Sequence, residues 1–476
     1  MCGQRPRLSN NWLFLHQWAN EGAVNLKKEY MFLRLLVFIS IGLGPVAGSV
    51  NAQDSAAGPL PSRWDLQTCL DYAKKNNITL NSLRLSVRTA QQNYLLARAA
   101  RQPTLAGSVP ITYTHSKNAN PVVGGFQTES SFANNFTLAS GVTIYNGGAI
   151  TDNIRAMNLA LEASNQTVVE NELDITLEIV QDYLNILLAK ENVVYVEDLL
   201  RSTAAQVDQG KQEYEVGTIA RNAYIQLQAQ LATDKYTLVT AQNAVRQNKL
   251  LLKQLLQLPF QDSFDIVKPD TVISSEAVSP LDSVEAYALR NRPEIKLGEL
   301  GIDISRNNLA IAKTGYLPLL TAAATLSTGY SNNQTSDYVQ QLDNNFFQQV
   351  GLNLSIPIFN RRSVKTSVEN AKIQIEQSRL TLLANQTTLA QTIEQAYINV
   401  LNAQGQYDAA VEELKANEEA FRVATEQLKA GASDIVNYLQ QKTLYTQAFQ
   451  SYVQAKYNSA LSIEIYDFYM GKAVKL

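Results

Sequence analysis

The chain has 476 residues, of which 45% are hydrophobic and 17% are charged, and its formal net charge is −3. It contains two cysteines and two histidines. This slight acidic excess argues against a nucleic-acid-binding protein, and so few Cys and His side chains argue against a Cys/His metal site or a histidine-based catalytic triad.

The first 52 residues have the pattern of an export signal. Basic residues and Met31 precede an apolar run at 35–43, and small residues at 50–52 form a plausible cleavage site. The run is too short to span a bilayer as a helix. We expect residues 1–52 to be a signal peptide with an N-terminal extension, translated from Met1 or Met31. An uncleaved amphipathic anchor is the alternative.

Removal of this leader leaves 35 basic and 41 acidic residues, a net charge of −6. Cys69 and His115 then remain as the single cysteine and the single histidine, so no disulfide can form within the chain. We expect no metal, no cofactor, no nucleic-acid partner and no enzymatic activity.

The first half of the mature chain begins with a helical segment, 64–101, which its Asn-Asn pair divides in two. The segment ends before Pro103, because the residue before a proline is pushed out of helical geometry. Apolar and polar residues then alternate, which predicts strands at 104–115 and 132–145 around a Gly/Asn/Ser-rich loop at 115–131.

A long helix follows and runs to about Gln209, and its apolar seam is marked by Ile150, Ile154, Met157, Leu161, Val168 and Ile175. Gly217 predicts a tight turn at its tip, since glycine readily takes the left-handed conformation that ends a helix. A returning helix at 220–258 and a linker at 261–280 with one short strand complete this half.

The second half repeats this order. After an opening helix it has predicted strands at 319–330 and 347–358, a long helix from Ser363, a tip at Gly431 and a returning helix at 435–470. The long helix carries a seven-residue apolar repeat, the mark of a coiled-coil seam. The repeat consists of Ile393, Val400, Tyr407, Leu414, Phe421 and Leu428. At about 1.5 Å per residue, this helix would be roughly 100 Å long.

The two halves are copies of one unit. Gly217 matches Gly431 at an offset of 214 residues, and Pro103 matches Pro318 at 215. Such self-similarity indicates a duplicated architecture. We therefore divide the mature chain into repeats at 53–280 and 281–476.

The four predicted strands carry no charge and are about ten residues long, which fits transmembrane β-strands. A soluble sheet would need a second layer over its apolar face, and the neighbouring sequence offers none. Four strands cannot close a membrane barrel, which needs about eight. The pattern therefore predicts an oligomer. We favour three chains and twelve strands, although the sequence leaves other numbers open.

This arrangement resembles the TolC-type outer-membrane efflux proteins from about Trp64 to Met470. The features that carry the resemblance occur twice: the opening-helix tyrosines, the prolines that bound the strands, and the glycine tips. The residues are Tyr72, Tyr287, Pro103, Leu317-Pro318, Pro357-Ile358-Phe359-Asn360, 214–218 and 430–435.

The resemblance implies a mainly α fold of the α+β class, in which duplicated long-helix hairpins form an α-barrel and four strands per chain contribute to a trimeric, 12-stranded transmembrane β-barrel. It implies a homotrimer in lipid of the outer membrane, with the helical part in the periplasm. It also implies the function of an exit duct for a tripartite efflux or type I secretion system, with a periplasmic adaptor protein and an inner-membrane pump as partners. The cargo and the class of pump stay open.

The resemblance places the periplasmic entrance at the helix tips. Gly217 and Gly431 would form the turns where the adaptor docks, flanked by Tyr214, Thr218, Leu428 and Ala432. Both glycines could instead be simple helix terminators.

At the constriction, family members carry acidic residues six and nine positions after the tip glycine. This chain has Asn437 and Gln440 after Gly431, and Ala223 and Gln226 after Gly217, which puts an acidic ring in doubt. Asp434 could supply a substitute ring, although a helix cap is the favoured interpretation. From their location, Arg221 and Arg422 are further candidates for stabilising the closed state.

Two other functions compete. An enzyme is disfavoured because the sequence has no phosphate loop, nucleophile elbow or His-Glu-x-x-His motif. A structural coiled-coil protein or adhesin of the envelope would explain the heptads and the export signal, but not two matching pairs of uncharged strands. Ion conductance separates a channel from a strut.

Overall fold

The computed structural model describes residues 63–119, 124–259, 264–269, 275, 277–472 and 474. They all belong to one compact unit, Pro61–Leu476. The predicted signal peptide, residues 1–52, lies outside the described residues.

The helices of the two halves form four pairs of equal length. Each helix of the short opening pair has 11 residues, and each helix of the next pair has 22. Each long helix has 67 residues, and each returning helix has 35. In chain order they are α3 (Leu66–Asn76), α4 (Ile78–Ala99), α5 (Ala149–Glu215) and α6 (Arg221–Leu255), then α7 (Leu281–Asn291), α8 (Pro293–Thr314), α10 (Ser363–Lys429) and α11 (Ile435–Tyr469). This equality supports the internal duplication, and the fold is mainly α, as predicted.

The opening helix breaks at Asn77, as its sequence predicts. The Asn77 side chain accepts hydrogen bonds from the backbone N–H groups of Thr79 and Leu80, so the residue that ends α3 also caps α4. At the matching break in the second half, α8 begins with Pro293, which has no N–H to leave unpaired at a helix start.

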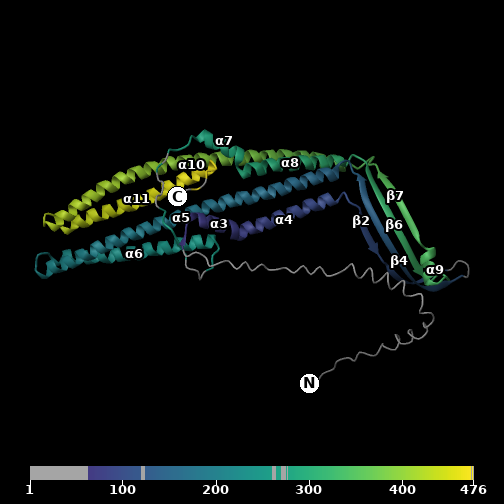
Figure 1. The fold of residues 1–476 in the computed structure, drawn as a ribbon, viewed down its shortest axis with the longest axis horizontal. Helices are drawn as coiled ribbons and strands as arrows, with labels where there is room; N and C mark the ends of the chain where they lie inside the picture. Colours follow the sequence, from purple (N-terminus) through teal and green to yellow (C-terminus); the bar gives the residue numbers. More distant parts are fainter. Residues whose placement is uncertain are drawn as a thin grey trace, which may run out of the picture. The chain divides into compact units, whose positions relative to one another are not determined.

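The strands form one antiparallel sheet at one end of the long helices (Figure 1). Its members are β2 (Thr104–Ser108), β3 (Ile111–Ala119), β4 (Phe126–Tyr145), β6 (Leu319–Ser331) and β7 (Phe347–Ser355). Both β2 and β3 pair with β4, one after the other along the same edge. The sheet is therefore four strands wide, in the order β2/β3, β4, β6, β7.

The strand boundaries differ from the expected ones in three places. The strand expected at 104–115 is divided at Pro110, because proline has no N–H for the ladder. The loop expected at 115–131 is mostly strand, since β3 extends to Ala119 and β4 starts at Phe126. The strand expected at 347–358 ends at Ser355, two residues before Pro357.

Two smaller elements complete the set. β1 (Arg63–Trp64) pairs in parallel with β5 (Asp265–Ile266), so the linker does contain one short strand. α9 (Tyr338–Asn344) lies between β6 and β7 and was not expected. None of the described helices is long and apolar enough to cross a membrane.

The helices next to the sheet have the same lateral order as the strands. α4 packs against α5, α5 against α8, and α8 against α10 (Figure 1). Toward the tips, α6 packs against α5, α5 contacts α11, and α11 packs against α10. The sheet and the helices thus form two layers with matching edges. One lateral edge is β7 in the sheet and α10 in the helical layer. The other edge belongs to the first repeat: β2/β3 in the sheet, α4 among the helices next to it and α6 toward the tips.

The predicted heptad seam of α10 faces α11. Ile393 and Val400 belong to a buried cluster that also includes Ile463 and Tyr466 of α11. Further toward the tip, the ring of Phe421 stacks on Tyr445 at 5.3 Å between centroids. The seam thus joins two antiparallel helices of one chain into a coiled-coil hairpin.

Candidate functional site

The register of the sheet divides its side chains into an apolar face and a polar face. Residues directly opposite in an antiparallel pair lie on the same face. The apolar face also includes a few polar residues, among them Asn134, Ser140, Thr328 and Gln348; its apolar members are Leu105, Ile111, Tyr113, Phe132, Phe136, Leu138, Val142, Tyr145, Leu320, Ala322, Ala324, Leu326, Tyr330, Val350, Leu352 and Leu354. Many of these are exposed, and Val350 reaches 85%. A face of this kind, uncovered within the chain, is suited to lipid.

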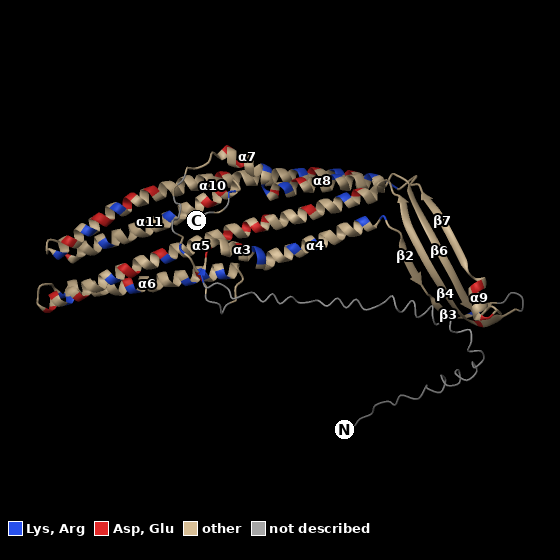
Figure 2. Ribbon diagram, in the orientation of Figure 1, with Lys and Arg blue, Asp and Glu red and all other residues tan. Residues whose placement is uncertain are grey.

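The polar face consists mainly of small, hydroxyl and amide side chains, with Phe347 of β7 and Glu129 of β4 among the exceptions. Its members include Thr104, Ser108, Thr112, Asn135, Thr137, Thr143, Thr321, Thr325, Ser327, Gln349, Gly351 and Asn353. β2, β6 and β7 contain no charged residue, whereas β3 and β4 extend beyond the predicted uncharged segments and contain one each, Lys117 and Glu129; most of the charged residues lie along the helices (Figure 2). Such a surface suits a water-filled interior.

The first helix tip turns at Gly217, where φ is +80°. The Thr218 N–H donates to the Glu213 carbonyl at 2.8 Å and the Gly217 N–H to the Tyr214 carbonyl at 3.1 Å, so the turn pairs groups that the end of α5 would leave free. Tyr214 stacks on Tyr224 of α6, with centroids 5.6 Å apart, which braces the hairpin.

The second tip turns in the same way at Gly431, where φ is +69°. The Ala432 N–H donates to the Gln427 carbonyl at 2.9 Å. Asp434 then caps α11, because its Oδ1 accepts a hydrogen bond from the Asn437 N–H at 2.9 Å. The favoured capping interaction is therefore present, whereas a ring of Asp434 side chains at a constriction stays a prediction.

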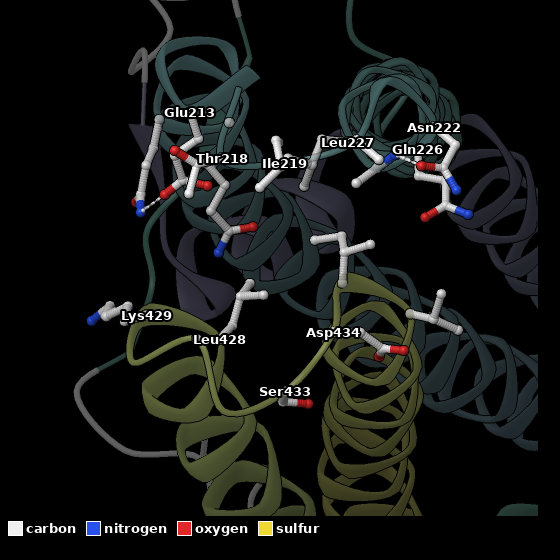
Figure 3. A pocket seen from close by; sticks show the side chains of 18 of the residues that line it. Glu213, Thr218, Ile219, Asn222, Gln226, Leu227, Leu428, Lys429, Ser433 and Asp434 are labelled. Atoms are coloured by element: carbon white, nitrogen blue, oxygen red, sulfur yellow. Dashed lines mark hydrogen bonds between the residues drawn. The ribbon is translucent and has the colours of Figure 1, made fainter. Parts of the chain in front are cut away.

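A cleft of about 670 Å³ separates the two tips of the chain (Figure 3). Five of the predicted residues line it, namely Thr218, Gln226, Leu428, Gly431 and Asp434. The other five, Tyr214, Gly217, Ala432, Asn437 and Gln440, are not among its lining residues. The structure thus brings half of the predicted set together, although the two halves of that set are some 200 residues apart in sequence.

Two residues that line the cleft, Gln206 and Gln226, each have a buried amide Oε1 that no described residue pairs. A buried polar atom left unpaired costs free energy.

A buried polar cluster, which the sequence did not suggest, joins the two hairpins above the cleft. Lys442 Nζ on α11 donates to Asp234 Oδ2 on α6 at 2.7 Å and also to Thr203 Oγ1 on α5. The side chains of Lys442 and Asp234 are only 2% and 5% exposed. Burial lowers the pKa of the Lys442 ammonium group, and the hydrogen bond to Asp234 opposes this shift.

A signal for this cluster was present in the sequence. Lys442 interrupts an otherwise aromatic seam of α11 that includes Tyr438, Tyr445 and Phe449. A charged residue at a seam position needs a partner, but periodicity alone does not say that Asp234, 208 residues away, is that partner.

The two arginines considered for the closed state lie elsewhere. Arg422 makes two hydrogen bonds to Glu419 on the same exposed helix surface, at 2.7 and 2.8 Å. Arg221 is the exposed first residue of α6. Within the described residues, no group of three or more His, Cys, Asp or Glu side chains could hold a metal ion.

Comparisons with known proteins agree with this geometry. The model of the family described as "Outer membrane efflux protein" matches residues 69–257 and 286–464. Outer membrane protein TolC of Vibrio cholerae is 22% identical over 445 residues, covering 90% of this chain and 93% of that protein. Proteases secretion protein PrtF of Dickeya chrysanthemi is 23% identical over 417 residues, covering 84% of each. A crystal structure of CusC superposes with a TM-score of 0.73 at 18% identity, over 84% of this chain and 91% of that one.

Proposed function

The chain belongs to the outer membrane efflux protein family, and from this premise we propose that three copies form a closed duct through which cargo leaves the cell. The protein is located in the outer membrane, and it is an exit duct for efflux or secretion. The enzymatic alternative finds no support among the relatives, whose names are those of outer membrane and secretion proteins.

The observation that carries this proposal is the shared lateral order of strands and helices. In each layer the two lateral edges are different, with β2/β3 and α4 on one side and β7 and α10 on the other. Unlike edges favour a head-to-tail contact, which forms a ring when the rotation closes. One rotation between neighbouring copies can thus close both the sheets and the helices into rings.

The size of the ring follows from the strands. Four strand positions per chain give eight in a dimer and twelve in a trimer, and membrane barrels need at least about eight. We propose the trimer because a twelve-stranded ring leaves a water-filled interior, whereas side chains fill one of about eight strands. Exposed leucines on both helical edges, Leu96 of α4 and Leu380 of α10, would become buried between copies.

The helix tips are the proposed docking site for a periplasmic adaptor, which links the duct to an inner-membrane pump. The cleft between the tips supports this role, because residues of both turns line it and a partner's side chains could enter it. Energy for transport would come from the pump, and the polar face of the sheet, on which Glu129 is the one charged residue of β2, β3, β4, β6 and β7, would let cargo pass without strong binding.

Reversal potentials of the purified protein in a planar bilayer test the duct. We expect Thr325→Lys to shift ion selectivity toward anions and Thr325→Glu toward cations, because this residue lies on the polar face. The two variants control for each other, since a non-specific perturbation would not change sign with the charge. A folded trimer that never conducts would favour the envelope strut, whereas shifts in the same direction for both variants would show that Thr325 does not line the conducting path.

A second pair of variants tests the constriction at Asp434. Asn also caps helices well, so Asp434→Asn removes the charge and keeps the cap, whereas Asp434→Ala removes both. A conductance change in both variants would support a charged ring. A change in Asp434→Ala alone would restrict this residue to its capping role.

A further inference from the structure

The short helix α9 completes the distal rim of the sheet, the end furthest from the helix tips (Figure 1). β6 continues to Ser331, but its pairing with β7 extends only from Leu319 to Ser327. Side chains around α9 take over where β7 stops. Gln341 Oε1 accepts a hydrogen bond from the Ser331 N–H, and Asn345 Nδ2 donates one to the Gly329 carbonyl, both at 2.8 Å.

Gln341 is the anchor of this helix. It is completely buried, and its Nε2 also donates to the Ser336 carbonyl at 2.7 Å. Both ends of its amide group are therefore paired, one to the strand and one to the segment before α9. This arrangement fixes α9 against the sheet and leaves the opposite side of the helix free.

The free side of α9 continues the apolar face of the sheet. The Tyr338 ring lies 5.0 Å from the ring of Tyr330, which in turn lies 6.4 Å from Phe132. Tyr338 and Val339 are 38% and 61% exposed, beside the polar residues Gln340 and Asp343. Aromatic rings with a polar tip and mixed polar neighbours are typical of the boundary between lipid and water.

The position of these aromatic residues matches the thickness of a membrane. Tyr330 is ten residues from Leu320, which lies opposite Tyr145 at the other end of the apolar face. Ten residues at about 3.3 Å each, tilted by about 40°, extend over roughly 25 Å along the membrane normal, which is the usual height of the apolar band. Tyr145 and the Phe132–Tyr330–Tyr338 cluster thus bound the band on its two sides.

We propose that α9 lies among the lipid headgroups of the outer leaflet, with Tyr338 and Val339 against lipid, and thereby fixes how deep the sheet sits in the membrane. The inference rests on the proposed function, because it requires that the apolar face contacts a bilayer. The β3–β4 ribbon of a neighbouring copy is the other possible occupant of this surface, and the test separates the two.

Depth-dependent fluorescence quenching tests the proposal. Single tryptophans are introduced by Tyr338→Trp, Val350→Trp or Tyr145→Trp, and each mature protein, residues 53–476 without Trp12 and Trp18, is reconstituted in phosphatidylcholine vesicles with a quencher at the headgroup or deep in the acyl chains. Trp64 is buried in the helical part and gives a constant background. Tyr236→Trp on exposed α6 is the matched control outside the membrane.

We expect the Tyr338→Trp and Tyr145→Trp reporters to lose more emission to the headgroup quencher, and the Val350→Trp reporter to the deep one. Equal loss to both quenchers at position 338, or none, would overturn the interfacial position of α9, and no loss would assign this surface to the neighbouring copy. If the reporter at position 350 also escaped quenching, the sheet would not be in the bilayer and the proposed function itself would fail.

The anchor is tested by Gln341→Met, which keeps the volume and removes both hydrogen bonds. In the Tyr338→Trp background we expect the preference for the headgroup quencher to disappear, while the reporter at position 350 keeps its preference for the deep one. Retention of the headgroup preference would show that Gln341 does not hold the helix in place.

Discussion

At the scale of single residues, the buried ion pair of Lys442 and Asp234 allows little substitution, because each charge requires the other. Two charges have been removed from water between helices that belong to different hairpins. Each is tolerated only because of the other, since an uncompensated buried charge is far more costly than a paired one. The cluster therefore specifies how the two hairpins face each other above the cleft.

Lys442→Met should destabilise the protein by about 3–5 kcal/mol, because it leaves Asp234 charged and buried without its partner. The double variant Lys442→Met with Asp234→Leu should recover most of this loss. Denaturant unfolding of the detergent-solubilised protein, followed by helical circular dichroism, measures both effects.

The matched control is Arg422→Met, which removes an exposed pair on the surface of α10. Its unfolding midpoint should not differ measurably from that of the native chain, because exposed pairs contribute little. Equal effects at Lys442 and Arg422 would contradict the special role of the buried cluster.

At the scale of secondary-structure elements, the tip glycines act through their backbone conformation. A Cβ added at Gly217 or Gly431 would meet no atom within 4 Å, so any cost of substitution comes from the positive φ alone. Gly405 offers the comparison, because it lies within α10 and also has open space around it.

Gly431→Ala should therefore destabilise by about 1–2 kcal/mol, the cost of the left-handed conformation for a residue with a Cβ. Gly405→Ala should instead stabilise by up to about 1 kcal/mol, because alanine is the better helix former. Thermal unfolding of the two variants should shift in opposite directions. Shifts of the same sign would show that the tip does not require the left-handed conformation.

The sequence predicted these elements better than the contacts between them. The hydrophobic periodicity and the positions of prolines were sufficient to predict the long helices, the tips and the strand pairs. In these elements the local conformational preference of the residues and the pattern of buried apolar side chains favour the same secondary structure. They failed for α9, whose seven residues span too few turns for a period, and for the ribbon of β3 and β4, whose polar residues looked like a loop. Capping by Asp434 was predictable because its partner is three residues away. The link from Lys442 to Asp234 was not, because it depends on how separate hairpins pack.

At the scale of the whole molecule, the edges of the two layers decide how copies assemble. Leu96 on α4 is 71% exposed in the single chain, on the side where we propose that the next copy packs. Such a residue contributes to assembly without contributing much to the fold of the chain.

Leu96→Asp should weaken the trimer and leave the helical content unchanged, because the charge would be buried only between copies. Val216→Asp, at an exposed tip residue, is the control and should leave the trimer intact. Light scattering coupled to size-exclusion chromatography measures the mass of each variant. A trimer that withstands Leu96→Asp would place the interface on another side.

The duplication has a consequence for symmetry. In a ring of three chains, the tips at Gly217 and Gly431 alternate, so six similar turns occupy two classes of quasi-equivalent positions. The classes are not interchangeable, because a side chain caps α11 at Asp434 whereas Ala220 before α6 provides none. A partner that distinguishes the classes would bind in three copies, and one that tolerates both would bind in six. The sequence difference between the two repeats thus determines whether three or six copies of a partner bind the trimer.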